Sequence, residues 1–335
     1  MKKVVQTSIK IVLPIVLGTF VLIWVYRDFD FIRAGDIFLH KMNPWWMLFS
    51  LSFGVFSHII RGLRWKQAIE PLGYNPSNQL CIDSIFLSYA TNLVIPRAGE
   101  VTRCGVLKRY DSIPFGVSFG TVVTERIIDM ISSLIFVVAS IFFQFDTLIS
   151  FLRKTGVTSK HIKSLFSGSK LFYLIVGVLF VTLVCYSIFR YIGLGKRIRE
   201  MTFQMRDGLL SIGKVRHHSL YMLYTAGIWV CYFFHFSITF YCFPFTSSLG
   251  LGAALLLFVA GSFAVLVPTP NGAGPWHFAI ISGLVLYGVD AIDAAAFALI
   301  VHGLQTLLVI VLGIFSMIAL QFRRKSAKFV GNHKH

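Results

Sequence analysis

Three charged residues in the segment 92–103 (NLVIPRAGEVTR) have the types and the spacing to bind an anion. Arg97, Glu100 and Arg103 recur at every third position. On a helix this spacing places them near one face, where Glu100 can pair with either arginine. Guanidinium groups suit phosphate because their N–H donors form a planar fork. The segment therefore predicts a site for an anionic group such as a phosphate.

A second charged segment, TERIID, follows in the chain. Its Glu125 and Asp129 are four residues apart, so on a helix they repel each other unless a cation lies between them. Arg97 or Arg103 is the expected cation, and Arg126 belongs to the same cluster. An ionisable side chain at membrane depth costs about 2.5 to 3.5 kcal/mol on insertion scales, so six charges in an apolar chain indicate a functional site. The alternative is a static salt-bridge network that holds helices together.

The segment 267–277 (VPTPNGAGPWH) combines helix breakers with groups that can face an anion. Its first two prolines interrupt a helix, whereas its two glycines permit positive φ and a close approach of the backbone. Pro275 suits the first turn of the next helix, whose free amides can face an anion. The candidate binding residues are Asn271, Gly272, Gly274 and His277. The alternative for the segment is a purely structural turn. The alternative for His277 is a buried histidine whose hydrogen bonds are satisfied within the membrane, because it has no metal-ligand spacing to the other histidines of the apolar segments.

The composition places these residues in a membrane protein. Hydrophobic residues make up 56% of the chain and charged residues 13%, and the mean hydropathy is +0.74. These values are outside the range of soluble globular domains. The net charge of +17 comes from Lys and Arg in short loops between apolar runs, which indicates a membrane surface as the partner and not nucleic acid. The sequence has no nucleotide-binding, nucleophile-elbow or HExxH motif, so it predicts no catalytic residue, no cofactor and no metal.

The apolar segments predict an all-α polytopic membrane protein with about six full crossings and two re-entrant hairpins, because each crossing needs about 20 apolar residues. The expected crossings are 11–26, a helix from Pro44 that ends at the basic residues Arg61, Arg64 and Lys66, and then 113–145, 171–189, 219–243 and 292–322. The hairpins are 80–96, which turns near 96–99, and the pair 251–267 and 275–289. Interrupted helices that face opposite sides, as in an inverted repeat, indicate a transporter binding site near the midplane. Eight full crossings are the alternative.

The distribution of Lys and Arg predicts the orientation. Cations precede the first apolar segment and follow the second, and seven lie in 190–216, which places both termini in the cytoplasm by the positive-inside rule. The basic loop 146–170 is then external, against that rule. We expect one integral membrane domain over 1–335, with a cytoplasmic basic tail at 323–335, in the cell (plasma or inner) membrane.

Four segments in order, SHIIRGLRW, NLVIPRAGEVTR, VVTERIIDM and VPTPNGAG, carry a family resemblance. Over about residues 11–320 the chain resembles the transmembrane region of lysylphosphatidylglycerol synthases and the related stand-alone flippase-like proteins. The resemblance implies movement of aminoacylated phospholipid between leaflets without the soluble synthase domain. Many relatives have a glutamate soon after the second Gly-rich turn, where this chain has Gly274, Pro275, Trp276 and His277.

We therefore expect a lipid flippase-like protein that translocates an anionic or aminoacylated phospholipid or a lipid-linked intermediate, and that is not itself an enzyme. The expected substrate-binding residues are Arg97, Glu100, Arg103, Glu125, Arg126, Asp129, Asn271, Gly272, Gly274 and His277. The alternatives are a membrane-embedded transferase of aminoacyl or glycosyl groups, its non-catalytic partner, and a membrane scaffold. The expected partners are the lipid, the membrane and a lipid-modifying enzyme.

Overall fold

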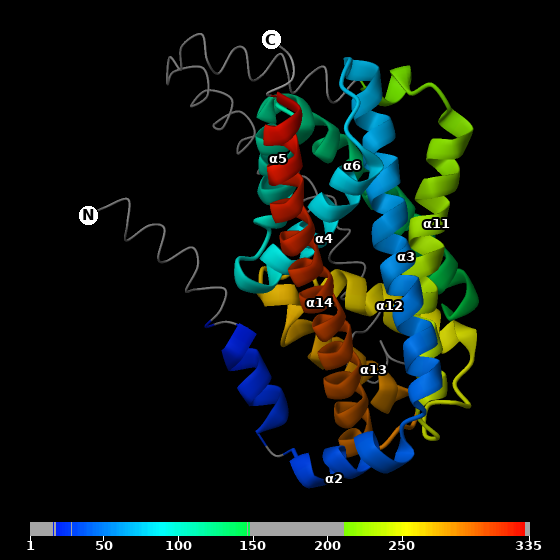
Figure 1. Cartoon of the computed structure of the whole chain (residues 1–335). Helices are drawn as coiled ribbons and strands as arrows, with labels where there is room; N and C mark the ends of the chain where they lie inside the picture. Colours follow the sequence, from blue (N-terminus) through cyan, green and yellow to red (C-terminus); the bar gives the residue numbers. More distant parts are fainter. Residues whose placement is uncertain (1–15, 17, 28, 146, 148–210, 332–335) are drawn as a thin grey trace, which may run out of the picture.

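The structure is a computed structural model that describes residues 16, 18–27, 29–145, 147 and 211–331 (Figure 1). These residues form helices and their connections, and no strand occurs among them. The prediction of an all-α polytopic membrane protein is confirmed.

Four long apolar helices have the length of membrane crossings. They are α3 (Pro44–Ile69), which a 3₁₀ turn extends to Leu72, α6 (Phe115–Phe143), α11 (His218–Ser237), which a 3₁₀ turn extends to Cys242, and α14 (Ala291–Gly331). At 1.5 Å per residue, the 26 residues of α3 measure about 39 Å, more than the hydrocarbon core of roughly 30 Å. They correspond to four of the six predicted crossings. Of the other two, 11–26 is described only at residues 16 and 18–26, which are helical, and 171–189 lies outside the described residues.

Side-chain caps fix where these helices begin. The Asn43 side chain accepts a hydrogen bond from the amide of Trp45 at 3.0 Å, and Pro44 occupies the first helical position of α3. Ser77 caps α4 (Asn78–Val94) by accepting from the amide of Leu80, and Asp290 accepts from the amide of Ile292 at the start of α14. A short helix, α2 (Phe31–Asp36), is capped in the same way by Asp30.

Two pairs of short helices form the predicted hairpins. The first consists of α4 and α5 (Gly99–Tyr110), and the second of α12 (Leu251–Ala264) and α13 (Pro275–Leu286). With 12 residues each, α5 and α13 measure about 18 Å, too short to cross the hydrocarbon core.

Each hairpin turns where the backbone adopts positive φ. In the first hairpin the turn is at Arg97, with φ of 63°, and the Asn92 side chain accepts a hydrogen bond from the amide of Gly99. In the second hairpin a 3₁₀ turn (Pro270–Gly272) lies within the break, and the positive φ values belong to Asn271, Gly272 and Gly274. A helix break within a membrane protein requires such local partners for its freed backbone groups.

The two hairpins enter the bundle from opposite ends (Figure 1). We call the end where α3 ends and α6 begins the upper end, and the end where α14 begins the lower end. The hairpin α4–α5 descends from the upper end, and the hairpin α12–α13 rises from the lower end. Their tips meet, because α4 contacts the 3₁₀ turn of the second hairpin and Arg97 Nη2 donates to the carbonyl of Leu266 at 2.7 Å.

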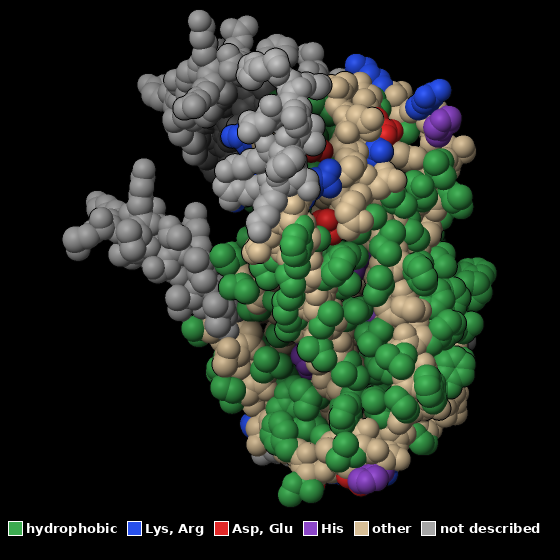
Figure 2. Space-filling model, viewed as in Figure 1, with side chains coloured by type: hydrophobic (Ala, Val, Ile, Leu, Met, Phe, Trp, Pro, Cys, Tyr) green, Lys and Arg blue, Asp and Glu red, His purple; other side chains and the backbone are tan. Residues whose placement is uncertain are grey.

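Apolar side chains cover much of the outer surface. Green side chains extend over the lower part of the molecule in Figure 2, whereas Lys and Arg gather at the upper end. On α6, Met130, Leu134 and Val138 are exposed, and on α14 Val311 and Phe315 are exposed. An apolar face of this extent is expected where lipid is the solvent.

Candidate functional site

A cluster of buried charges joins α3, α5 and α6. Arg64 of α3 lies between the two acidic residues of α6: its Nε is 3.2 Å from Glu125 Oε1 and its Nη2 is 3.0 Å from Asp129 Oδ1. The side chains of Arg64 and Glu125 have no exposed surface. Arg64 Nη1 also donates to the Thr225 hydroxyl on α11. The guanidinium fork therefore holds both carboxylates at once.

Two further arginines complete the buried part of the cluster. Arg61, one turn before Arg64, places Nη1 at 2.7 Å from Asp129 Oδ2. Arg103 of α5 places Nη1 at 2.7 Å from Glu125 Oε2, and its guanidinium lies 4.7 Å from the ring centre of Trp65. Arg103 Nη2 is buried without a hydrogen-bond partner among the described residues.

The charge cluster carries an excess of positive charge. Arg126, whose side chain is 45% exposed, also contacts Asp129, at 2.9 Å. Four arginines then face two carboxylates, which gives a net charge of +2. Asp129 is at the middle of α6, whereas Arg61 and Arg64 lie in the last third of α3. Charges within the apolar part of a membrane are stable only when they are paired or face a polar ligand.

The structure corrects the predicted pairing of these residues. Arg103 does contact Glu125, but Arg64 takes the position between Glu125 and Asp129. Of the two expected cations, Arg97 does not reach this pair, because it is at the hairpin tip and binds the carbonyl of Leu266. Glu100 pairs with neither arginine among the described ion pairs; it is in the first turn of α5, where the helix dipole favours a carboxylate.

Arg61, Arg64 and Lys66 were predicted as the basic end of the second crossing, but the structure places the first two inside the bundle. The helix continues to Ile69, and the side chains of Arg61 and Arg64 are 3% and 0% exposed. Their spacing of three residues on one face of a long helix was the available signal. It could not show that α6 would lie opposite them, because that contact is tertiary.

The second predicted set of residues comes together at the turn of the hairpin α12–α13. Asn271 Nδ2 donates to the Thr306 hydroxyl at 3.0 Å, and the Asn271 carbonyl is 3.1 Å from His302 Nε2. The His277 ring is buried, accepts from the amide of Gly274 at Nδ1, and is 4.5 Å from the His302 ring centre. These contacts attach the turn to α14.

The contact between His277 and His302 was missed by sequence reasoning, which treated the histidines as unrelated. No group of three or more metal-ligating side chains occurs in the part of the chain that the structure describes. At Gly274, with φ of 91°, an added Cβ would approach Val21 to 2.8 Å. The glycine therefore permits close packing of the N-terminal helix on this turn.

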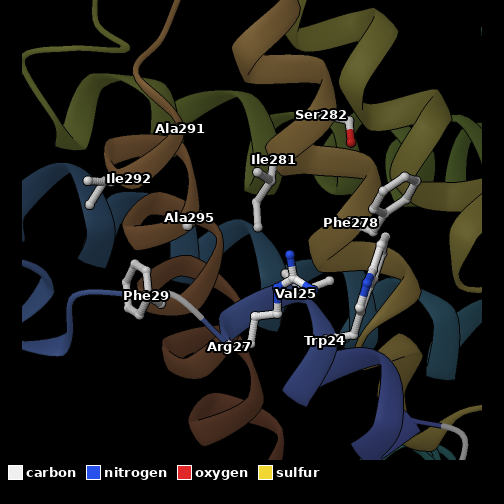
Figure 3. Close-up of a pocket in the computed structure, with 10 residues that line it drawn as sticks. All are labelled: Trp24, Val25, Arg27, Phe29, Phe278, Ile281, Ser282, Ala291, Ile292 and Ala295. Carbon is white, nitrogen blue, oxygen red and sulfur yellow. The ribbon is translucent and has the colours of Figure 1, made fainter.

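A separate groove of about 360 Å³ lies between the N-terminal helix, α13 and α14. Figure 3 shows the Arg27 side chain reaching toward its middle, with the rings of Trp24 and Phe278 beside each other, 5.7 Å apart. Ile281 and Ser282 come from the same helix as Phe278, and Ala291, Ile292 and Ala295 of α14 line the other wall. The groove is thus largely apolar with one guanidinium and one hydroxyl, and none of its lining residues belongs to the charge cluster.

Long apolar helices, two opposed hairpins and a buried charge cluster define a polytopic helical membrane protein with re-entrant segments. The chain belongs to the family of the lysylphosphatidylglycerol synthase TM region, whose model matches residues 11–313.

Two curated relatives are similar to parts of the chain. Glycosyltransferase AglD of Haloferax volcanii is 34% identical over 79 residues, which are 23% of this chain and 13% of that protein. A UPF0104 membrane protein of Methanocaldococcus jannaschii is 29% identical over 94 residues, which are 27% of this chain and 28% of that protein. The matched segments thus cover less than a third of either relative. No solved structure matches the chain.

Proposed function

We propose that the protein moves the headgroup of an anionic or aminoacylated phospholipid, or of a lipid-linked intermediate, between the leaflets of the membrane. The observation that carries this proposal is the meeting of the two hairpin tips at Arg97 and Leu266, on an exposed part of the bundle. Interrupted helices that enter from opposite sides are the usual setting of a transporter site near the midplane. When one hairpin moves, a headgroup at the tips becomes accessible from one end of the bundle. When the other hairpin moves, the headgroup becomes accessible from the opposite end.

The positive excess of the charge cluster supports an anionic headgroup. Arg61, Arg64 and Arg103 are held by carboxylates, whereas Arg97 and Arg126 are exposed and can offer their donors to a phosphate. The buried arginines then act as a fixed positive support beside Arg126, which shares Asp129 with them. In this proposal Glu100 and the turn at Asn271–His277 shape the path and do not bind phosphate directly.

We propose that the upper end faces the cytoplasm, with both termini there, in the cell membrane. Exposed cations collect at this end, among them Lys108, Arg109, Lys214 and Arg216. At the lower end, by contrast, Arg33 pairs with Asp293 at 2.7 Å and Lys41 lies 3.9 Å from Asp36. An excess of unpaired cations on one side is the pattern of a cytoplasmic face.

A reconstitution assay tests the proposal. The purified protein is placed in liposomes that contain a fluorescent phosphatidylglycerol, and a membrane-impermeant quencher reports the fraction of label reaching the outer leaflet. We expect faster exchange than in protein-free liposomes, and a large loss in Arg97→Gln and Arg126→Gln. Lys41→Gln, an exposed cation at the lower end, is the matched control and should exchange like the native protein. Native protein that exchanges no more label than empty liposomes contradicts the proposal.

A membrane-embedded transferase, or a non-catalytic partner of one, is the second candidate, and the similarity to a protein named a glycosyltransferase favours it. Incubation of the native protein with a lipid acceptor and labelled sugar or aminoacyl donors tests it. Product formed by this chain alone would make it an enzyme. We propose instead that it acts without chemistry, together with an enzyme that modifies the lipid.

A further inference from the structure

His58 is a buried histidine beside the charge cluster that the proposed lipid path does not use. It lies one turn before Arg61 on α3 and is 7% exposed. Its ring centre is 4.2 Å from that of Tyr89 on α4 and 6.3 Å from that of Tyr232 on α11. The residue therefore sits where three helices meet.

Two hydrogen bonds and one ring contact join the cluster to His58. Arg61 Nε donates to the Tyr232 hydroxyl at 3.2 Å, and the hydroxyls of Tyr232 and Tyr89 are 2.6 Å apart. The Tyr89 ring in turn lies against the His58 ring. Arg61 also pairs with Asp129, at 2.7 Å. Within the charge cluster, a positive charge on His58 therefore acts most strongly on the ion pair between Arg61 and Asp129.

His58 differs from the other histidines of the bundle in its hydrogen bonds. His235 Nδ1 contacts the Ser50 carbonyl, His302 Nε2 contacts the Asn271 carbonyl, and His277 Nδ1 accepts from the Gly274 amide. Nδ1 of His58 is buried and has no partner among the described residues. This nitrogen has unused hydrogen-bonding capacity, and a histidine is the side chain whose charge ordinarily changes between pH 5 and 8.

We infer that His58 takes up a proton when an anionic headgroup binds at the charge cluster, so that headgroup and proton bind together. This inference rests on the proposed function and names the ion that accompanies the lipid.

The charges that face His58 explain the coupling. Arg61 on its own helix opposes a second positive charge, and Asp129 of α6 reaches it only through Arg61. From the other helices it faces the rings of Tyr89 and Tyr232 and, further along α11, His235. A phosphate beside the arginines adds negative charge and favours the charged imidazole. By linkage, the protonated imidazole then strengthens phosphate binding by the same factor.

Binding of a short-chain phosphatidylglycerol to the full chain in detergent, followed by calorimetry from pH 5.5 to 8, tests the inference. The phosphodiester keeps its charge over this range, so a pH effect belongs to the protein. We expect the Kd to rise with pH, with a limiting slope of about tenfold per pH unit for one linked proton. Buffers of different ionisation enthalpy should also report proton uptake on binding.

Two variants assign the proton to His58. His58→Gln should bind with a Kd that does not depend on pH and without proton uptake. His40→Gln, an exposed histidine near the lower end that contacts Asp36, should behave like the native protein. Native protein that binds the lipid without pH dependence and without proton uptake overturns this inference and leaves the proposed function standing. The same is true if folded His58→Gln retains both effects. Absence of lipid binding by the native protein at every pH overturns the proposed function and, with it, the inference.

Discussion

Removal of the Glu125 carboxylate should destabilise the protein more than removal of Arg64, one of the two arginines that contact it. The cluster has a net charge of +2, because Arg61, Arg64, Arg103 and Arg126 face only Glu125 and Asp129. Glu125→Gln raises this charge to +3 and leaves Arg103 with no carboxylate partner. Breaking a buried ion pair in this way costs about 3 to 5 kcal/mol.

Arg64→Met lowers the net charge to +1 instead. Each carboxylate then keeps at least one arginine, Arg103 for Glu125 and Arg61 for Asp129. The loss is then mainly that of charged hydrogen bonds, about 1.5 to 3 kcal/mol. Arg126→Gln, at a half-exposed pair, should cost less than about 1 kcal/mol.

Unfolding of the three variants by heat or denaturant in one detergent measures the order of these losses. The double variant Glu125→Gln with Arg103→Met should be more stable than Glu125→Gln, because it removes the arginine left without a partner. If Arg64→Met is less stable than Glu125→Gln, the excess of positive charge does not govern the cluster and the reasoning is refuted.

Three further predictions concern the hairpins and the orientation. Gly274→Ala should lower the free energy of unfolding by about 1 to 3 kcal/mol, because φ is 91° and the new Cβ meets Val21. The control Gly303→Ala, in open space on α14, should be neutral or stabilising in the same unfolding assay. Equal losses in the two variants would contradict the packing of the N-terminal helix on this turn. Arg97→Gly relieves a positive φ but removes the contact with Leu266, so we expect a folded protein with slower lipid exchange, and unchanged exchange would remove that contact from the mechanism. A single cysteine at Asn75, which is exposed at the upper end, should react with an impermeant thiol reagent only from inside. A single cysteine at Ser247, which is exposed at the lower end, should react only from outside. Labelling of both from one side would contradict the topology.

The elements of the fold were predictable because they depend on local pattern. Runs of apolar residues predicted the four long helices α3, α6, α11 and α14, and Pro and Gly in the segments around Arg97 and Asn271 predicted the two turns. The partners of the charged residues were not predictable, because a period of three or four residues shows that side chains share a face and not which helix lies opposite. Arg64 was therefore missed as the cation between Glu125 and Asp129. Of the two candidates named instead, Arg103 contacts Glu125 and Arg97 lies at the hairpin tip.

The most direct test of the account is lipid exchange with the two hairpin tips joined. In a protein without the five natural cysteines, Arg97→Cys and Leu266→Cys are linked by a flexible, reducible crosslinker after reconstitution into liposomes with fluorescent phosphatidylglycerol. Each single-cysteine variant treated with the same reagent is the control. We predict that exchange stops when the tips are joined and returns when the link is reduced. Exchange at an unchanged rate while the tips are joined would contradict the claim that lipid passes between the two hairpins.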